Sequence, residues 1–448
     1  MIIRKKMTNF AINSKKQRLY PMLKINCNRF TTLIFIHLLS GLCKAQEPSP
    51  SNVSKRWGYE ADFQAGRVLV LDKYQKSYMR DKGDYSIGFK INHATLPNDS
   101  DSYAHDYHYP TISLESRFSK NDGATMYRTT DYPSGNITPA SYESHLGNSL
   151  ALFGSFSYPI LRTNRWELSL TGNLGFAYSF KKYDKENNVD NDMIGSHILF
   201  YAGGSLNATY RFAPSWGLKA GLDYWHISNG STRQPNRSAN IAGPTLGIIY
   251  YPYYETLVST SRNFTPNAFE PYWYLNLKAG TGIRTCIEDW DYYQYKISTD
   301  SPEYRKEHFP TYMCYSFQAD LMYRYGRTGS IGGGIDIQYG SYSDHIAELD
   351  ALKGKDCPHS PWSAAIDVKH QFFYKNVSFS LGAGVYLYHK MGDFAKRHDL
   401  FFFNRTGLHY SFPSLHNLTL GIEVTAHLAK AEFTELVISY PIKFKKQQ

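Results

Sequence analysis

From Trp57 onward, apolar and polar residues alternate with a period of two rather than 3.6. Between Trp216 and Ser228, for example, Leu218, Ala220 and Leu222 alternate with lysine, glycine and aspartate. An extended chain points successive side chains to opposite faces, so each such segment has one apolar face. We therefore expect a protein built from β-strands, each with one side turned to a core or to lipid.

Sixteen segments carry this pattern, and many are close to the ~10 residues that a tilted membrane strand needs. Short turns such as 213–215 and 326–330 alternate loosely with long polar loops, which is typical of outer-membrane proteins. We therefore predict an all-β fold over residues 57–448, a transmembrane antiparallel outer-membrane β-barrel of about 12–16 strands. The predicted strands are 57–70, 84–92, 110–118, 149–158, 166–180, 197–211, 215–228, 242–252, 272–285, 312–325, 329–341, 361–374, 377–389, 400–412, 417–428 and 431–444.

Composition excludes several other classes of protein. After the N-terminal region, no stretch supplies the ~20 continuous apolar residues of a spanning helix, and the mean hydropathy is −0.46. Aromatic residues make up 16% of the chain, which argues against disorder. A soluble β-sandwich remains an alternative, but it would leave many Tyr and Phe side chains in water. A barrel places them in its lipid-contact band and interfacial girdles.

The N-terminal region has the features of an export signal. Residues 31–42 form an apolar core behind a basic stretch, too short to span a membrane, and small residues predict cleavage after Ala45. We expect a signal peptide over residues 1–45, with Met22 as an alternative start, and a linker over 46–56. Cys43 suggests a lipoprotein as a weaker alternative, because Leu42 stands where a small residue is expected.

The net charge of +10 comes from that N-terminal region. Nine of the 49 basic residues lie in the first 45 positions, which hold no acidic residue, so 40 basic residues face 39 acidic ones in the remainder. The predicted mature chain is almost neutral, and a nucleic-acid partner is not expected.

The last predicted strand also fits an outer-membrane protein. Its apolar residues alternate up to Phe444, and a closing aromatic resembles the C-terminal insertion signal of such proteins. The chain departs from that signal in its final residues, KKQQ, because the aromatic is usually terminal.

The densest polar cluster, residues 223–240, begins at the end of one predicted strand. His226 and Ser228 continue the apolar face of that strand, so both should point to lipid near the membrane–water interface. A polar pair at that boundary is unfavourable unless the two groups bond to each other or perform chemistry. The alternative is an interfacial histidine beside an ordinary serine.

This spacing suits a nucleophile and its general base. Strand geometry puts the Cβ atoms of His226 and Ser228 roughly 6–7 Å apart, so a slight twist lets the ring take the hydroxyl proton during attack on an ester. A third group must hold the other ring nitrogen. Asn229 and Gly230 begin a tight loop whose backbone N–H groups can face a developing oxyanion.

The sequence HISNG, followed by PNRSANIAGPTLGIIYY, resembles the lipid A 3-O-deacylase (acyloxyacyl hydrolase) family of outer-membrane β-barrels, in particular its larger members from Bacteroidetes-type bacteria. The resemblance implies a serine esterase that removes a 3-O-linked hydroxyacyl chain from lipid A in the outer leaflet. It implies His226 as base, Ser228 as nucleophile, and Asn229 with nearby backbone N–H groups as the oxyanion site. The matching residues are His226, Ser228, Asn229, Gly230, Pro235, Asn236, Asn240, Gly243 and Gly247.

One position departs from the family pattern. The family's Glu stands fourteen residues after the histidine, where this chain has Asn240. An amide oxygen can accept the imidazole N–H and orient the ring, but it cannot neutralise an imidazolium. Activity would then be slower, or another carboxylate would assist, or the protein would have lost catalysis.

Other histidines offer no site by their spacing. His345, His370, His389 and His427 lie on separate segments, without partners at ligand spacing, so we expect no metal site. The predicted esterase chemistry requires no metal and no organic cofactor. Two alternatives stay open: a non-catalytic porin or uptake channel, and a surface adhesin whose long loops bind a partner. The sequence does not determine the oligomeric state.

Overall fold

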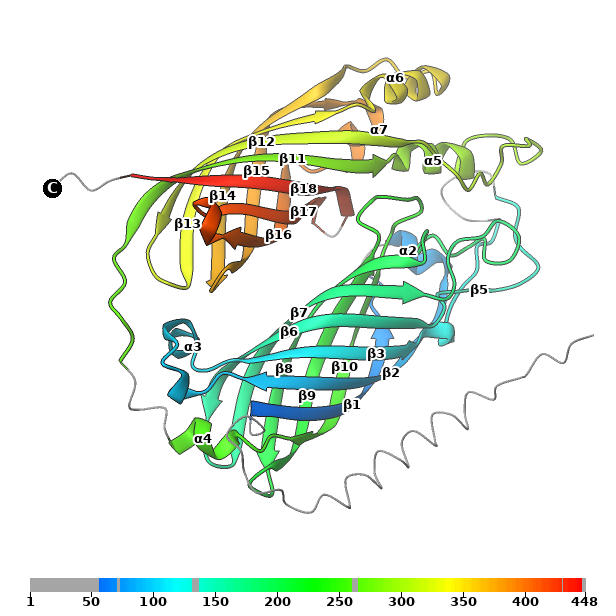
Figure 1. The fold of residues 1–448 in the computed structure, drawn as a ribbon. Helices are drawn as coiled ribbons and strands as arrows, with labels where there is room; N and C mark the ends of the chain where they lie inside the picture. The colour runs from blue at the N-terminus through cyan, green and yellow to red at the C-terminus, as the bar shows by residue number, and fades with distance from the viewer. Residues whose placement is uncertain (1–55, 71–72, 131–136, 260–264, 429, 445–448) are drawn as a thin grey trace, which may run out of the picture. The chain divides into compact units, whose positions relative to one another are not determined.

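The structure is a computed structural model that describes residues 56–70, 73–130, 137–259, 265–428 and 430–444 (Figure 1). The predicted signal peptide, all but the last residue of the predicted linker and the KKQQ tail lie outside the described residues. Within them, long antiparallel strands dominate, and the helices are short. None of the described helices has the length and apolar character needed to cross a membrane.

Eight long strands from the first half of the chain form one closed barrel, drawn blue to green in Figure 1. Neighbours along the ring pair antiparallel, and β1 closes it by pairing with both β10 and β2. The strands are β1 (Trp57–Val68), β2 (Met79–Ala94), β3 (Thr111–Lys120), β6 (Ser149–Arg162), β7 (Trp166–Ser179), β8 (Ile198–Arg211), β9 (Trp216–Ser228) and β10 (Ala239–Tyr250). Two short strands, β4 (Ala124–Met126) and β5 (Ser144–His145), extend the sheet beside β2.

The remaining strands form a second closed barrel, which β18 completes by pairing antiparallel with β11. They are β11 (Tyr272–Thr285), β12 (Thr311–Arg324), β13 (Gly329–Gly340), β14 (His359–Tyr374), β15 (Val377–Met391), β16 (Phe402–Phe412), β17 (Leu418–His427) and β18 (Lys430–Lys443).

The predicted all-β antiparallel barrel fold is confirmed, and each of the sixteen predicted segments contains most of a barrel strand. These strands are divided between two barrels, where the sequence led us to expect one barrel over residues 57–448. The physical reason is that the number of barrels depends on which strands distant in sequence pair to close a ring, here β1 with β10 and β11 with β18. The alternation within each strand is the same for one large barrel or two small ones.

The connections contain the helices. In the first barrel these are α2 (Lys73–Tyr78), η2 (Pro97–Asp99), α3 (Ser102–Asp106) and η3 (Asn121–Gly123), and α4 (Tyr254–Ser259) follows β10. In the second barrel they are α5 (Ile287–Tyr295), α6 (Ser343–Leu352), α7 (Gly392–His398) and η4 (Pro413–Leu415). The two longest connections of each barrel lie at the same end of that barrel, because an even number of strands separates them; they join β3 to β6, β7 to β8, β11 to β12 and β13 to β14. In outer-membrane barrels that end faces the cell exterior.

Apolar side chains cover the outside of both barrels. Along β9, exposed Leu218 and Leu222 alternate with buried Lys219 and Asp223, and β18 alternates in the same way. An exposed apolar band around a closed barrel with a polar interior is the arrangement that lipid requires.

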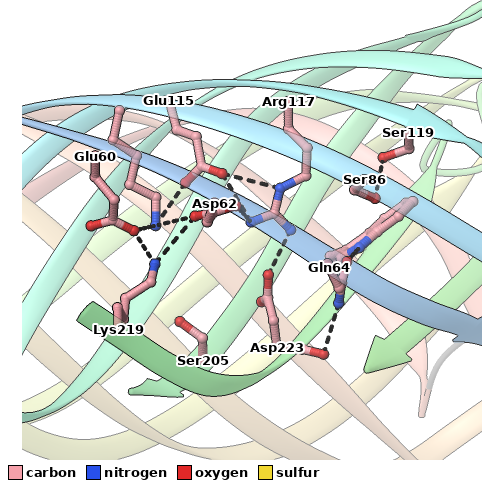
Figure 2. A network of polar contacts seen from close by, with 12 residues as sticks. Glu60, Asp62, Gln64, Ser86, Glu115, Arg117, Ser119, Ser205, Lys219 and Asp223 are labelled. Atoms are coloured by element: carbon pink, nitrogen blue, oxygen red, sulfur yellow. Dashed lines mark hydrogen bonds and ion pairs between the residues drawn. The ribbon is translucent and has the colours of Figure 1, made fainter. Parts of the chain in front are cut away.

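The interior of the first barrel is filled by a network of charged side chains (Figure 2). Arg117 of β3 donates to Asp223 of β9 at 2.6 Å and bonds Glu115 at 2.9 Å. Lys90 bonds Glu115 at 2.9 Å, and Lys219 bonds Glu60. Each charge therefore has an opposite partner, which offsets the cost of removing it from water.

Candidate active site

The strand pair β9–β10 positions the predicted site residues. His226 lies opposite Asn240 of β10 on one side and Ala202 of β8 on the other, and Phe200 lies opposite Ser228. The outward series Leu218, Leu222 and Tyr224 on β9 continues to His226 and Ser228, while Trp225 and Ile227 between them are buried inside. The structure thus places the pair on the outward side, at the end of β9 where the 229–238 connection begins.

The interior network fixes the other side of β9. Asp223 accepts from Arg117, and the indole N–H of Trp225 donates to Gln64 Oε1 at 2.9 Å. Gln64 Nε2 in turn donates to the backbone carbonyl of Asp223 at 3.2 Å. These hydrogen bonds and ion pairs tie the inward side chains of β9 to β1 and β3 (Figure 2).

Three side chains form a hydrogen-bonded series on the outward side. His226 Nε2 lies 3.0 Å from Ser228 Oγ, and His226 Nδ1 lies 2.8 Å from Asn240 Oδ1. The amide oxygen of Asn240 can only accept, so Nδ1 donates to it. In the neutral ring, Nε2 then carries the lone pair and accepts from the Ser228 hydroxyl. This is the polarity that a general base needs in order to activate an alcohol.

Sequence reasoning missed Tyr224. Its hydroxyl donates to Asn240 Oδ1 at 2.7 Å, so the amide oxygen accepts from both the phenol and the imidazole. The sequence did contain one signal for Tyr224: it stands two residues before His226, so both side chains lie on the same face of β9. The second donor restrains the Asn240 side chain and thereby the imidazole ring.

The connection after Ser228 is held by its own hydrogen bonds. The backbone N–H of Asn229 donates to Asn236 Oδ1 at 3.0 Å, and the Asn229 side chain donates to the carbonyl of Arg233 at 3.0 Å. Both groups are therefore engaged within the loop rather than aimed at an incoming oxygen. Gly230 has φ +63°, a left-handed conformation that favours glycine. Ser228 itself is only 7% exposed, so little space is open around its hydroxyl.

Two family models match the chain. Residues 109–248 match the model described as lipid A 3-O-deacylase (PagL), and residues 272–446 match the acyloxyacyl hydrolase C-terminal domain. The first match contains His226, Ser228 and Asn240, and the second spans the strands of the second barrel. The chain belongs to the lipid A 3-O-deacylase family.

Solved structures that the chain matches include an outer membrane enzyme and two porins. The crystal structure of the outer membrane enzyme PagL is 15% identical and covers 43% of this chain and 98% of its own, with a TM-score of 0.25. A triple mutant of Rhodopseudomonas blastica porin is 9% identical and covers 86% and 99%, with a TM-score of 0.16. The NanC porin is 6% identical, with the same coverage and a TM-score of 0.15. None of the curated proteins compared with the chain matches it.

Membership of this deacylase family makes the chain a carboxylic ester hydrolase of the outer membrane, with a lipid as its substrate. The resemblance drawn from the sequence around His226 is thereby confirmed at the level of the family.

Proposed function

We propose that the chain removes an ester-linked 3-O-hydroxyacyl chain from lipid A, with Ser228 as nucleophile and His226 as general base. The observation that carries this proposal is the hydrogen-bonded series from Ser228 through His226 to Asn240 on the outward side of β9 and β10. Lipid A lies in the outer leaflet, so its ester reaches an outward-facing site without entering the barrel. The export signal proposed over residues 1–45 accounts for delivery to that membrane.

In the first half of the reaction, His226 Nε2 takes the proton of Ser228 Oγ as the oxygen attacks the acyl carbonyl carbon. The tetrahedral intermediate collapses when the ester C–O bond breaks, and His226 returns the proton to the departing sugar oxygen. In the second half, His226 deprotonates a water molecule that attacks the acyl-Ser228 ester. The second tetrahedral intermediate collapses as the bond from the acyl carbon to Ser228 Oγ breaks, His226 returns the proton to that oxygen, and the hydroxy fatty acid leaves.

The oxyanion needs donors beside Ser228. The N–H of Asn229 is engaged by Asn236, so the backbone N–H of Gly230 is the first donor to the oxyanion. Contribution from Asn229 would require its bond to Asn236 to break when substrate binds. The left-handed Gly230 therefore has a conformational role that a residue with a Cβ would disturb.

Asn240 stands in for the family's acid. Its amide oxygen holds His226 in the tautomer that accepts from Ser228, while Tyr224 restrains the amide. An amide carries no net charge, so the imidazolium formed during attack is stabilised less than it would be beside a carboxylate. We therefore propose a working but slow esterase.

The channel alternative is disfavoured by the interior of the first barrel. A porin needs a water-filled lumen, whereas here Arg117, Lys90 and Lys219 are buried and paired with carboxylates across it. The adhesin alternative does not account for an aligned Ser–His pair on the outward side of the barrel, and no observation favours it over the esterase.

The test is mass spectrometry of lipid A after exposure to the purified protein and to its Ser228→Ala variant. Ser205→Ala is a matched control, because it removes a hydroxyl from the interior side of the neighbouring strand β8. We expect loss of one hydroxyacyl mass with the unmodified protein and the control, and none with Ser228→Ala. Identical spectra with and without the unmodified protein would overturn the proposal.

A further inference from the structure

Three ionisable side chains that are distant in sequence meet at one end of the second barrel. His389 comes from the end of β15, Asp399 follows α7, and His427 ends β17. Asp399 Oδ2 lies 3.6 Å from His389 Nε2 and 3.9 Å from His427 Nε2. A second carboxylate oxygen, Oε2 of Glu432, lies 3.3 Å from His427 Nε2. The sequence showed no ligand spacing for these histidines; barrel closure brings them together.

The other nitrogen of each ring is already bound. His427 Nδ1 lies 3.1 Å from the carbonyl oxygen of Phe402, and His389 Nδ1 lies 2.9 Å from Ser363 Oγ. A carbonyl only accepts, so His427 Nδ1 donates and, in the neutral ring, Nε2 carries the lone pair. This is how metal-binding histidines are usually oriented by their surroundings.

Both Nε2 atoms are buried and have no hydrogen-bond partner among the described residues. His427 is 6% exposed. Their nearest polar neighbours are carboxylate oxygens, which are also acceptors. Asp399 Oδ1 is already paired with Lys430, and Glu432 Oε1 with Arg284, so the carboxylate charges are partly compensated. The two Nε2 atoms are not, and a divalent cation between them and Asp399 Oδ2 would accept their lone pairs.

The distances suit a divalent transition metal. Zn–N and Zn–O bonds of about 2.0–2.2 Å put neighbouring ligand atoms of a tetrahedron about 3.3–3.6 Å apart. Asp399 Oδ2 lies 3.6 Å from His389 Nε2 and 3.9 Å from His427 Nε2, so small side-chain shifts suffice. We propose that His389, His427 and Asp399 bind one divalent transition-metal ion, with Zn²⁺ as the expected ion. A pocket of about 390 Å³, lined in part by His389 and Asp399, provides a route of entry.

A nearby cluster provides the contrast. Asp350 Oδ2 accepts from His359 Nε2 at 2.9 Å, from Cys357 Sγ at 3.3 Å and from the backbone N–H of Asp393 at 2.8 Å. In that cluster three donors already face the Asp350 carboxylate, and their hydrogen bonds offset the cost of burying its charge. The proposed site differs because the Nε2 atoms of His389 and His427 make no such hydrogen bond to Asp399.

The test uses the full chain in detergent, stripped of metal with a chelator and then titrated with Zn²⁺. We expect one equivalent of Zn²⁺ per chain, with affinity at least about 100-fold weaker in His389→Gln and in His427→Gln, because a ligand is lost. His359→Gln is the matched control and should bind as the unmodified protein does. Failure of the unmodified protein to retain Zn²⁺ on dialysis would overturn the proposal.

Two further measurements distinguish this site from the Asp350 cluster and from misfolding. The Co²⁺ complex should lack a thiolate charge-transfer band; such a band would assign the metal to Cys357 and contradict the proposal. Ser363→Ala keeps all three ligands but frees His389 Nδ1, and should weaken Zn²⁺ binding about tenfold. Unchanged affinity in that variant would also contradict it. Neither measurement involves Ser228 chemistry.

Discussion

Asn240 lies directly opposite His226 across the β9–β10 pair, and its amide oxygen is 2.8 Å from Nδ1 of the imidazole. The register of the β9–β10 pair therefore places Asn240 where it orients the imidazole of His226, and no loop residue is needed. The family pattern has a glutamate at this position, and the difference between amide and carboxylate is the main chemical question that the site raises.

Restoring the acid should accelerate the enzyme. In Asn240→Glu, a carboxylate beside Nδ1 would stabilise the imidazolium formed as Ser228 attacks, so kcat for deacylation should rise by about tenfold or more. Asn240→Ala, which removes the acceptor, should lower it. Rates from lipid A mass spectra in time series give the comparison. A folded Asn240→Glu protein that is no faster would show that Asn240 does not occupy the acid's role.

Tyr224 is a positioning residue in this account. Tyr224→Phe removes one neutral hydrogen bond to Asn240, and a net value of about 0.5–1.5 kcal/mol corresponds to roughly a two- to tenfold fall in kcat with KM unchanged. The decisive control is a double-mutant cycle, since the loss should vanish in an Asn240→Ala background. An equal loss in both backgrounds would mean that the phenol acts independently of Asn240.

The interior network should dominate the stability of the first barrel. Arg117 is 2% exposed and bonds both Glu115 and Asp223, so Arg117→Met leaves the buried Asp223 without its cation and Glu115 with Lys90 alone. We expect a loss of about 3–5 kcal/mol in the free energy of unfolding, measured by urea unfolding in lipid vesicles. Arg165→Met, at an exposed turn, should change it by less than about 0.5 kcal/mol. Equal effects would show that the network does not support the barrel.

A pH-dependent contact joins α5 and α6. His345 Nε2 lies 2.7 Å from Asp289 Oδ1, and this hydrogen bond raises the pKa of His345 above its usual value. The stabilisation is fully present below the unfolded pKa of about 6.5 and is lost as pH rises through the higher folded pKa. Amide exchange of α6, corrected for intrinsic rate, should therefore speed up relative to β12 between pH 6 and pH 9. In His345→Gln this pH dependence should disappear; its persistence would contradict the assignment.

Alternation predicted most of the fold, because the side on which a residue lies is a local property of a strand. The outward position of His226 and Ser228 follows from the same parity that sets Leu218 and Leu222 toward lipid. The number of barrels was not predictable in this way. It depends on the pairings of β1 with β10 and of β11 with β18, which join segments distant in sequence and leave no local mark in it.

The candidate site was predictable where its residues are close in sequence or follow a family motif. Tyr224 was missed because its role depends on the register between β9 and β10. His389 and His427 were read as unrelated for the same reason, since their approach requires the second barrel to close. The engagement of the Asn229 N–H by Asn236 is a loop contact that no spacing rule indicates.

The most direct test of the central claim is to locate the covalent intermediate. The protein is treated with an alkyl fluorophosphonate, which reacts with a serine activated by a neighbouring base, and the labelled peptide is identified by mass spectrometry. We predict a single adduct on Ser228 that is lost in His226→Ala, together with loss of deacylation. An active, labelled enzyme whose adduct lies on another residue, or full activity after treatment with no adduct on Ser228, would contradict the account.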